Sequence, residues 1–488
     1  MNLTGGVEMT SVMWFRRDLR LEDNTALKHA FEESDQLILL FHVNPEQFLE
    51  DGATNQVSFF NSVKILEASI EEQGGKLHIL FGDIEDCFQK LKETFPDWSD
   101  VFINRDEKGY GLQRDKKMAQ FFKEHDIKAH GFFDHHIHYA TEIKTKSDTL
   151  YKVFTPYFRQ WKEKRKPDPV TVDFQKDKVV SSAEFEDHHE RFYKFLNEQV
   201  EINNQSKVEK LEQGNKAAHQ KIDEFIEEKL SEYKEARDFP LKDGTSRMSH
   251  HLRAGEISAR TVYSKIKAAP ESKGKETFIQ ELAWRDFYNM VYYAYPDQKE
   301  KEVDDNFSKV EWDNNEENFE KWKEGRTGFP IVDAAMRQLK QKGWMHNRLR
   351  MITASFLTKD LLIDWRWGEK YFQTHLVDYD PCSNIGGWQW AASTGTDGVP
   401  YFRIFNPTTQ SERFDKKGDF IRLYVPELKA IDTKKIHEPS TLTKEEQEEF
   451  GVIIGEDYPE PIVNHKRSRE LAIQAYEESK KKVQGEQD

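Results

Sequence analysis

The chain has 488 residues, which is enough for two or three domains that each bury a hydrophobic core. Its formal net charge of -16 disfavours attraction of nucleic acid to the whole surface, so a polyanion must be met by a local patch. Cys87 and Cys382 are the only cysteines, which excludes a disulfide framework and a four-thiolate metal cluster, and we expect no metal site.

Five apolar runs rich in β-branched and aromatic residues alternate with amphipathic stretches in the first part of the chain. The runs span residues 11–15, 36–43, 76–82, 100–104 and 128–133. This alternation is typical of βα units, so we predict a doubly wound, Rossmann-like α/β domain with a five-stranded parallel sheet over residues 9–137. The fingerprint G-x-G-x-x-G is absent after the first run, so a nicotinamide cofactor is not expected.

From about residue 161 to residue 220 the sequence is charged and irregular, with early prolines and few apolar periods. Such a composition is typical of a domain connector, and we place an interdomain linker at 138–208. His188 and His189 invite a metal interpretation. Adjacent histidines without further ligands at helical spacing are more often surface residues, and we interpret them in that way.

After residue 220 the pattern is helical nearly to the end, so we predict an all-α second domain over residues 209–488. Ahead of one of its helices, the segment 243–249 (DGTSRMS) places a glycine beside three hydroxyl residues. Backbone amides and hydroxyls there can hold a phosphate. The alternative is that Thr245 or Ser246 caps the helix, and the segment alone favours the cap.

The helix that begins near Phe278 has two contrasting faces. Its apolar face carries Ile279, Leu282, Ala283 and Met290, and the opposite face carries Glu281, Trp284, Arg285, Tyr288 and Tyr292. A solvated face does not normally gather three aromatic rings with a carboxylate and a guanidinium. We therefore favour stacking on a nucleobase, with packing of Trp284 against another domain as the alternative.

The stretch from residue 333 to residue 414 combines positive charge with aromatic rings. Between Ala334 and Lys359 it has no acidic residue but carries Arg337, Lys340, Lys342, Arg348, Arg350 and Lys359, which suggests an anionic partner. A helix near His346 sets Asn347 and Met351 one turn apart, while Leu349, Ile352 and Phe356 can face the core. The ordinary alternative is a solvated basic face with buried tryptophans.

Several long motifs resemble those of the photolyase/cryptochrome family, and specifically of class I cyclobutane pyrimidine dimer photolyases. They are WFRRDLRLEDN, DGTSRMS, ELAWRDFY, GFPIVDAAMRQL, GWMHNRLRM, IGGWQWAASTGTD and YFRIFNPTTQ, in the family's order and over almost the whole chain. The resemblance implies a light-driven deoxyribodipyrimidine photo-lyase that binds FAD in its helical domain. The α/β domain is then the antenna domain.

The resemblance also assigns roles to single residues. Residues implied to bind FAD are Tyr233, Thr245, Ser246, Arg247, Met248, Ser249, Arg285, Asn347, Arg350, Asp378, Asp380 and Asn384. Residues implied to act in catalysis are Glu281, Trp284, Asn347, Met351, Asn384 and Trp390. Residues implied to bind DNA are Glu281, Trp284, Asn347, Arg348, Met351, Trp390 and Arg403. Trp312, Trp365 and Trp388 occupy the positions of the family's electron-transfer chain.

The implied partner is UV-damaged DNA, single- or double-stranded. We expect a monomer. We also expect it in the cytoplasm without membrane contact, because the sequence has no secretory signal and no apolar run of spanning length. The runner-up is a cryptochrome-like photoreceptor, although Asn384 stands where plant-type cryptochromes carry Asp. The loop 104–111 departs from the Asn-Glu pattern of a folate site, so the second, antenna chromophore stays open between methenyltetrahydrofolate, a deazaflavin, another flavin and none.

Overall fold

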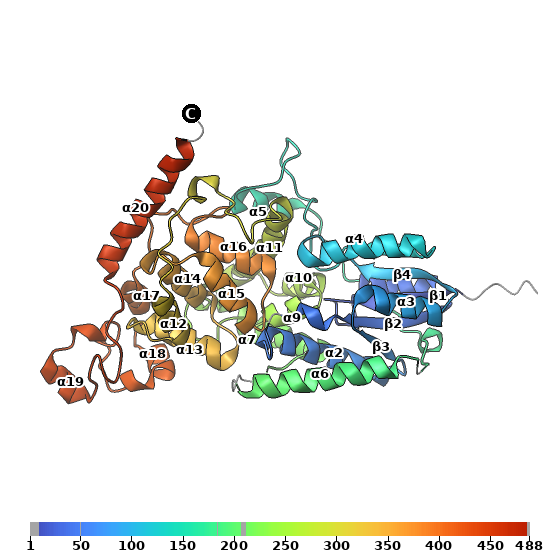
Figure 1. The fold of residues 1–488 in the computed structure, drawn as a ribbon, viewed down its shortest axis with the longest axis horizontal. Helices are drawn as coiled ribbons and strands as arrows, with labels where there is room; N and C mark the ends of the chain where they lie inside the picture. The colour runs from blue at the N-terminus through green and yellow to red at the C-terminus, as the bar shows by residue number, and fades with distance from the viewer. Residues whose placement is uncertain (1–8, 49, 183, 206–210, 486–488) are drawn as a thin grey trace, which may run out of the picture.

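The computed structural model describes residues 9–48, 50–182, 184–205 and 211–485. A domain built on one sheet lies beside a larger domain made of helices (Figure 1). The predicted α/β and all-α parts are therefore confirmed.

The sheet contains the five predicted strands, all parallel. They are β1 (Thr10–Phe15), β2 (Gln36–Val43), β3 (Leu77–Phe81), β4 (Trp98–Asn104) and β5 (Lys128–Phe132), in the order β3-β2-β1-β4-β5. From β1 the chain builds β2 and β3 on one side of the sheet and then β4 and β5 on the other side of β1. The loops after β1 and β4 therefore diverge and leave a crevice at the carboxyl ends of the strands.

Helices cover both faces of the sheet, as a doubly wound fold requires. Met13 and Phe15 of β1 pack into one core with α1 (Thr25–Glu33) and α2 (Thr54–Glu72), while Val12 and Trp14 pack into another with α3 (Ile84–Thr94) and α4 (Gly109–Glu124). Because successive side chains of a strand point to opposite faces, the continuous apolar run of β1 fills both cores. A 3-10 turn, η1 (Pro45–Gln47), follows β2.

The expectation of an irregular linker over 138–208 is wrong for much of that segment. It contains α5 (Phe154–Glu163), η2 (Lys176–Lys178) and the twenty-residue helix α6 (Glu186–Gln205), which lies beside α2 (Figure 1). Phe192 and Leu196, one turn apart, are buried in the core of the sheet. This apolar pair was hidden in a charged sequence. The expected boundary at 208/209 lies outside the described residues.

His188 is not the surface residue that its charged surroundings suggested. It is buried, and its Nδ1 lies 3.1 Å from both the backbone nitrogen and the backbone oxygen of Phe81 in β3. The neighbouring His189 places Nε2 2.8 Å from Glu67 of α2. His188 thus fixes α6 to β3, and His189 fixes it to α2.

The helical domain follows from α7 onward. Its elements are α7 (Asn215–Glu228), η3 (Leu230–Glu232), α8 (Tyr233–Ala236), α9 (Ser249–Ala254), α10 (Ala259–Ala268), α11 (Lys273–Ala294), η4 (Asp305–Phe307), α12 (Glu316–Glu324), α13 (Pro330–Lys342), α14 (Asn347–Ser355), the π-helix η5 (Phe356–Asp360), α15 (Trp365–His375), α16 (Pro381–Ala392), α17 (Pro407–Phe414), α18 (Asp419–Tyr424), η6 (Pro426–Leu428), η7 (Pro439–Thr441), α19 (Lys444–Phe450) and α20 (His465–Gln484). The largest core cluster is centred on α12 to α18 and extends to Tyr292 of α11 and to Tyr458 near the C-terminal end.

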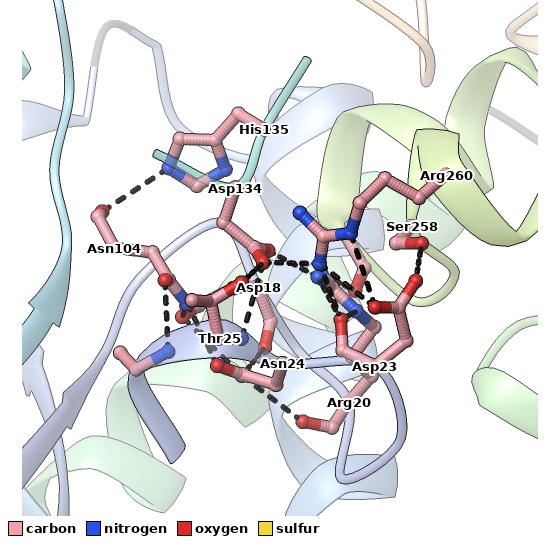
Figure 2. A network of polar contacts seen from close by, with 12 residues as sticks. Asp18, Arg20, Asp23, Asn24, Thr25, Asn104, Asp134, His135, Ser258 and Arg260 are labelled. Carbon is pink, nitrogen blue, oxygen red and sulfur yellow. Dashed lines mark hydrogen bonds and ion pairs between the residues drawn. The ribbon is translucent and has the colours of Figure 1, made fainter. Parts of the chain in front are cut away.

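A buried network of charges fixes the two domains to each other (Figure 2). Arg260 of α10 donates to Asp134, which follows β5, at 2.5 Å and to Asp23, which follows β1, at 2.9 Å. Arg20 also pairs with Asp134, and together the two guanidinium groups hold the pKa of Asp134 far below its usual range against the opposing effect of burial. Removing one partner would leave a buried charge uncompensated, so the arrangement favours a fixed relative position of the domains.

Candidate functional site

Helix α16 carries the first part of the family motif IGGWQWAASTGTD, including both of its tryptophans. Asp380 caps it, because Oδ1 accepts hydrogen bonds from Ser383 N at 3.0 Å and Ser383 Oγ at 3.1 Å. Asn384, one turn later, donates from Nδ2 to Oε1 of Glu369 in α15 at 3.2 Å. The Asn384 amide is therefore held in place by a neighbouring helix.

The two glycines of α16 have different surroundings. A Cβ on Gly386 would lie 2.3 Å from the ring of Tyr288, so α16 packs closely against α11 at this point. A Cβ on Gly387 would meet no atom within 4 Å, so open space lies beside it. At 100° per residue Gly387 falls between Asn384 and Trp390 on the helix surface. The surface of α16 is therefore bare between these two side chains.

The charged residues that were expected around the ring of FAD form pairs with each other or with backbone groups. Arg350 donates from Nη2 to Asp378 at 2.8 Å, and Arg285 donates to the carbonyl oxygen of His135 at 2.5 Å. Burial by itself raises the pKa of Asp380, but the cations of Lys108, Arg285 and Arg17 outweigh it and hold that pKa at about 2. Asp380 is therefore an anion throughout the ordinary pH range.

The loop 243–249 does not act as a helix cap. Helix α9 begins at Ser249, and its cap residue Met248 makes no side-chain capping bond, while Ser246 Oγ accepts the Met248 N–H at 3.4 Å. Arg247 has a positive φ of 56°, and its guanidinium lies 3.4 Å from the centre of the Trp344 ring. The cap alternative is therefore wrong, and Thr245 and Ser246, both half-buried, remain possible phosphate ligands.

The aromatic face of α11 is only partly free. Trp284 stacks on Phe154 of α5 with 3.5 Å between ring centres and 7° between planes, and its ring centre lies 5.5 Å from that of Tyr288. The packing alternative therefore holds for one face of this half-buried indole. Tyr292 was expected on the same face but is 8% exposed and belongs to the core. Glu281 is half-buried and forms an ion pair with Arg237.

Helix α14 has the two faces that the sequence predicted. Leu349, Ile352 and Phe356, the first residue of η5, are buried, which confirms the prediction. Asn347 is exposed, and its Nδ2 lies 3.8 Å from Sδ of the half-buried Met351 one turn later. Trp390 is half-buried and Arg403 is exposed, so both side chains reach solvent.

The basic run of residues 334–359 does not form a single positive patch. Arg337 pairs with Glu427 at 2.7 Å, and Arg348 pairs with Asp238 at 2.7 Å. Lys359 is buried, and its ammonium nitrogen lies 3.5 Å from the centre of the Tyr476 ring, where burial lowers its pKa well below the ordinary value. Interpreting the whole run as an anion-binding surface is therefore wrong. A local sequence pattern shows where the cations are but not which distant carboxylates pair with them in the folded chain.

Two of the three predicted electron-transfer tryptophans are buried, and Trp312 is half-buried. Trp388 contacts Phe372 of α15 at 5.0 Å and Trp322 of α12 at 6.2 Å between ring centres. These two rings were not predicted, although the aromatic residues of α12 and α15 were visible in the sequence. Glu369 and Arg237 were not predicted either, because the sequence contains no signal for them.

The crevice of the sheet is a cavity of about 600 Å³ that extends between the two domains. Aromatic rings line it, among them Trp14, Phe59 and Tyr110. Arg16 and Arg253 line it too, and within the described part of the chain neither Arg16 Nε nor Arg253 Nη1 has a hydrogen-bond partner although both atoms are buried. Aromatic rings and arginines together line this cavity, so it suits an anionic ligand with a flat ring.

Within the described ranges, no three His, Cys, Asp or Glu side chains are grouped closely enough to hold a metal ion. No helix in the same ranges combines the length and the apolar character that crossing a membrane requires.

Comparisons with known proteins agree with the geometry. The family model described as DNA photolyase matches residues 11–175, and the model for the FAD binding domain of DNA photolyase matches residues 278–478. A deoxyribodipyrimidine photo-lyase of Alkalihalophilus pseudofirmus is 43% identical over 96% of this chain and 98% of that protein.

Two solved structures are also similar. A bacterial class III photolyase from Agrobacterium tumefaciens has a TM-score of 0.86 and 35% identity, with 99% of this chain and all of that chain covered. An archaeal photolyase from Sulfolobus tokodaii, solved with two FAD molecules, has a TM-score of 0.80 and 32% identity, with 96% of this chain and all of that chain covered. With family models on both domains and near-complete relatives above 30% identity, the chain belongs to the DNA photolyase family.

Proposed function

We propose that this protein is a deoxyribodipyrimidine photo-lyase, which uses light to split cyclobutane pyrimidine dimers in UV-damaged DNA. The observation that carries the proposal is the open space beside Gly387, between the Asn384 amide and the Trp390 indole on α16. When bound, reduced FAD supplies an electron to the dimer after absorbing light and recovers it after the ring has opened. The protein's own residues then have to position the flavin and the dimer, surround them with suitable polar groups and exclude water.

The flavin ring fits the polar side of α16. Asn384 donates its N–H to Glu369, so its carbonyl oxygen is left to accept a hydrogen bond from a reduced ring. The ionised Asp380 and the Arg350–Asp378 pair supply fixed charges around the ring, together with Arg285. Thr245, Ser246, Arg247 and Ser249 are the proposed ligands of the phosphates and the sugar chain, beside Tyr233 and Met248.

The dimer fits next to the flavin, between aromatic walls. Trp284, backed by Phe154, presents a ring whose orientation is fixed before DNA binds, and Trp390 offers a second ring. A dimer stacks poorly in the duplex, so flipping it out costs less than flipping an intact pair. Burial raises the pKa of Glu281 despite the nearby Arg237 cation, so a protonated Glu281 can donate to a pyrimidine carbonyl on which negative charge develops.

The DNA face is the name we give to Glu281, Trp284, Asn347, Arg348, Met351, Trp390 and Arg403. On this proposal Arg348 and Arg403 contact phosphates, and the others contact the lesion, in single- or double-stranded DNA. Trp388, Trp365 and Trp312 carry electrons from the surface to an oxidised flavin. We further propose that the protein acts as a monomer in the cytoplasm, with an antenna domain at 9–137, a partly helical connector at 138–208 and a catalytic domain at 209–488.

The chromophore cavity, defined by the lining residues Trp14, Arg16, Phe59, Tyr110 and Arg253, is the proposed site of the second chromophore. Its size suits a ring system of two or three fused rings, and the Arg16 and Arg253 side chains that line it suit a carboxylate or phosphate on that molecule. Methenyltetrahydrofolate, a deazaflavin and a second flavin all meet these two conditions.

Illumination of the purified protein with a dimer-containing oligonucleotide tests the proposed function. We expect gentle denaturation to release FAD, and we expect dimers to disappear in blue light but not in the dark. A protein that carries reduced FAD and leaves the dimers intact in light would be a photoreceptor rather than a repair enzyme. Release of FMN alone from the helical domain would contradict the flavin assignment.

A further inference from the structure

Two consecutive residues after α8 hold two members of the DNA face. Arg237 donates from Nη1 to Oε1 of Glu281 on α11. Asp238 accepts at Oδ1 a hydrogen bond from Nη2 of Arg348 on α14, at 2.7 Å. Adjacent and opposite charges of one short segment therefore bridge the two helices that supply most of the proposed DNA contacts.

Close backbone contacts fix this segment. A Cβ on Gly274 of α11 would lie 1.8 Å from the carbonyl oxygen of Leu230, so α11 approaches the start of the segment as closely as only glycine allows. On the other side, a Cβ on Gly244 would lie 2.5 Å from Cβ of Ala236. The chain from Leu230 to Asp238, which contains α8, is held between α11 and the loop proposed to bind the flavin phosphates. Asp238 therefore occupies a defined place.

Asp238 satisfies only part of the Arg348 guanidinium. The guanidinium carbon lies 4.4 Å from the centre of the Phe414 ring, which orients its plane. Arg348 Nε is buried and has no hydrogen-bond partner among the residues that the structure describes. The Arg348 side chain is 18% exposed and that of Asp238 is 36% exposed, so solvent and a ligand can reach the pair.

A carboxylate and a phosphate present equivalent acceptor oxygens to a guanidinium, and both form charge-assisted hydrogen bonds with it. Asp238 thus occupies one of the positions at which a DNA phosphate can bind if Arg348 is a backbone contact. Partly exposed ion pairs are weak, so an incoming phosphate can take the place of the carboxylate.

We propose that Asp238 stands in for a DNA phosphate, holding Arg348 in its binding orientation in the free protein and competing with the DNA backbone for it. This inference rests on the proposed function, because it takes Arg348 as a DNA contact. In the free protein the pair neutralises a cation on the DNA face. On binding, the backbone phosphate replaces Asp238, and Arg237 keeps Glu281 in the lesion pocket.

The test is a double-mutant cycle on DNA affinity. Asp238→Asn keeps the shape of the side chain and removes the competing charge, so we expect binding to damaged and undamaged duplexes to tighten about two- to fivefold, equivalent to ~0.4–1 kcal/mol. In an Arg348→Ala background the same substitution should give no gain beyond the control, because the contact that it releases is absent.

The matched control is Glu235→Gln, which removes the same charge from an exposed side chain of α8. Its effect measures general attraction between a less acidic protein and DNA, and it should be smaller than that of Asp238→Asn. Asp238→Glu restores a carboxylate and should return the affinity towards that of the unaltered protein. FAD content and thermal unfolding of each variant show whether it is folded.

Three results would overturn the inference: no gain for Asp238→Asn, a gain equal to that of Glu235→Gln, or the same gain in the Arg348→Ala background. Failure of the proposed function gives a different result, because the unaltered protein would then bind dimer-containing and undamaged duplexes equally in the same titrations. If the folded Asp238→Asn variant loses affinity, Asp238 is a structural support and the competition proposal is wrong.

Discussion

The chromophore cavity and the DNA face both present arginines to a proposed anionic ligand, but they differ in what neutralises those arginines. In the cavity, Arg16 is paired with Asp115, but Arg253 forms no ion pair with any carboxylate of the described residues. On the DNA face, Arg348 is paired with Asp238. The cavity therefore leaves one arginine without an internal anion, whereas the DNA face supplies a carboxylate to Arg348.

This difference matches the time for which each ligand stays. A chromophore that remains bound can supply a permanent acceptor to a buried cation, and the protein needs no internal substitute. DNA must bind and leave in each cycle, so an exposed cation benefits from an internal carboxylate that an incoming phosphate can displace.

The largest effect should follow from Arg253→Leu. Loss of a buried charged hydrogen bond is worth ~1.5–3 kcal/mol, so binding of the second chromophore should weaken about ten- to 150-fold. FAD in the helical domain should remain. Pigments extracted after reconstitution with each candidate chromophore give the ratio, and Arg105→Leu, whose guanidinium stacks on Phe133 outside the cavity, is the control. An unchanged pigment ratio would mean that the cavity does not hold the anion.

On the DNA face, Trp284→Ala should selectively weaken binding to dimer-containing DNA. Stacking on a base is worth roughly 1–3 kcal/mol, which corresponds to about a five- to 150-fold loss. Binding to undamaged DNA should hardly change, because no flipped base contacts the indole there. Titrations of both duplexes measure this, with Trp284→Phe as a conservative control. Equal loss on both duplexes would assign Trp284 to the packing of α5 and α11 alone.

Arg348→Ala should weaken binding to both duplexes and reduce the dependence on salt. Each lost phosphate contact lowers the log-log salt slope by about 0.9. Arg253→Leu changes a residue that is not part of the DNA face and should leave the slope unchanged, and the contrast between the two variants isolates the DNA face. A slope that stays constant in Arg348→Ala would show that this guanidinium does not meet a phosphate.

The smallest effect concerns pH. Burial raises the pKa of Glu281, so its neutral, donating form becomes more populated as pH falls towards that raised pKa. Affinity for dimer-containing DNA should therefore rise on acidification, by less than about tenfold for a change of one pKa unit. Glu281→Gln donates at every pH and should give a flatter profile. If both proteins show the same profile, Glu281 does not titrate against the lesion.

The sequence predicted what depends on local periodicity. All five strands lie where apolar runs of five to eight residues ended at turn residues, and Leu349 and Ile352 face the core as helical spacing required. Helix α6 escaped prediction because Phe192 and Leu196 are sparse within a charged segment, although their spacing of four was a usable signal.

Pairing between distant residues could not be predicted. Arg237 and Glu281 are 44 residues apart in the chain, and Asp238 and Arg348 are 110 apart, so no local pattern connects them. The burial of Arg253 in the chromophore cavity likewise depends on the docking of α9 against the sheet domain. The family motifs identified the site residues, but they did not identify the carboxylates that neutralise the basic residues among them.

The central claim is that, in light, the electron passes from the flavin beside α16 directly to the dimer, and not through the tryptophans. The most direct test is repair by protein whose flavin has been chemically reduced beforehand, with Trp365→Phe beside the unaltered chain. We predict that both split dimers equally well in blue light, while Trp365→Phe, like Trp312→Phe, is slow to photoreduce an oxidised flavin. A pre-reduced Trp365→Phe protein that is folded and binds dimer-containing DNA, yet repairs no better than its oxidised form, would contradict the claim.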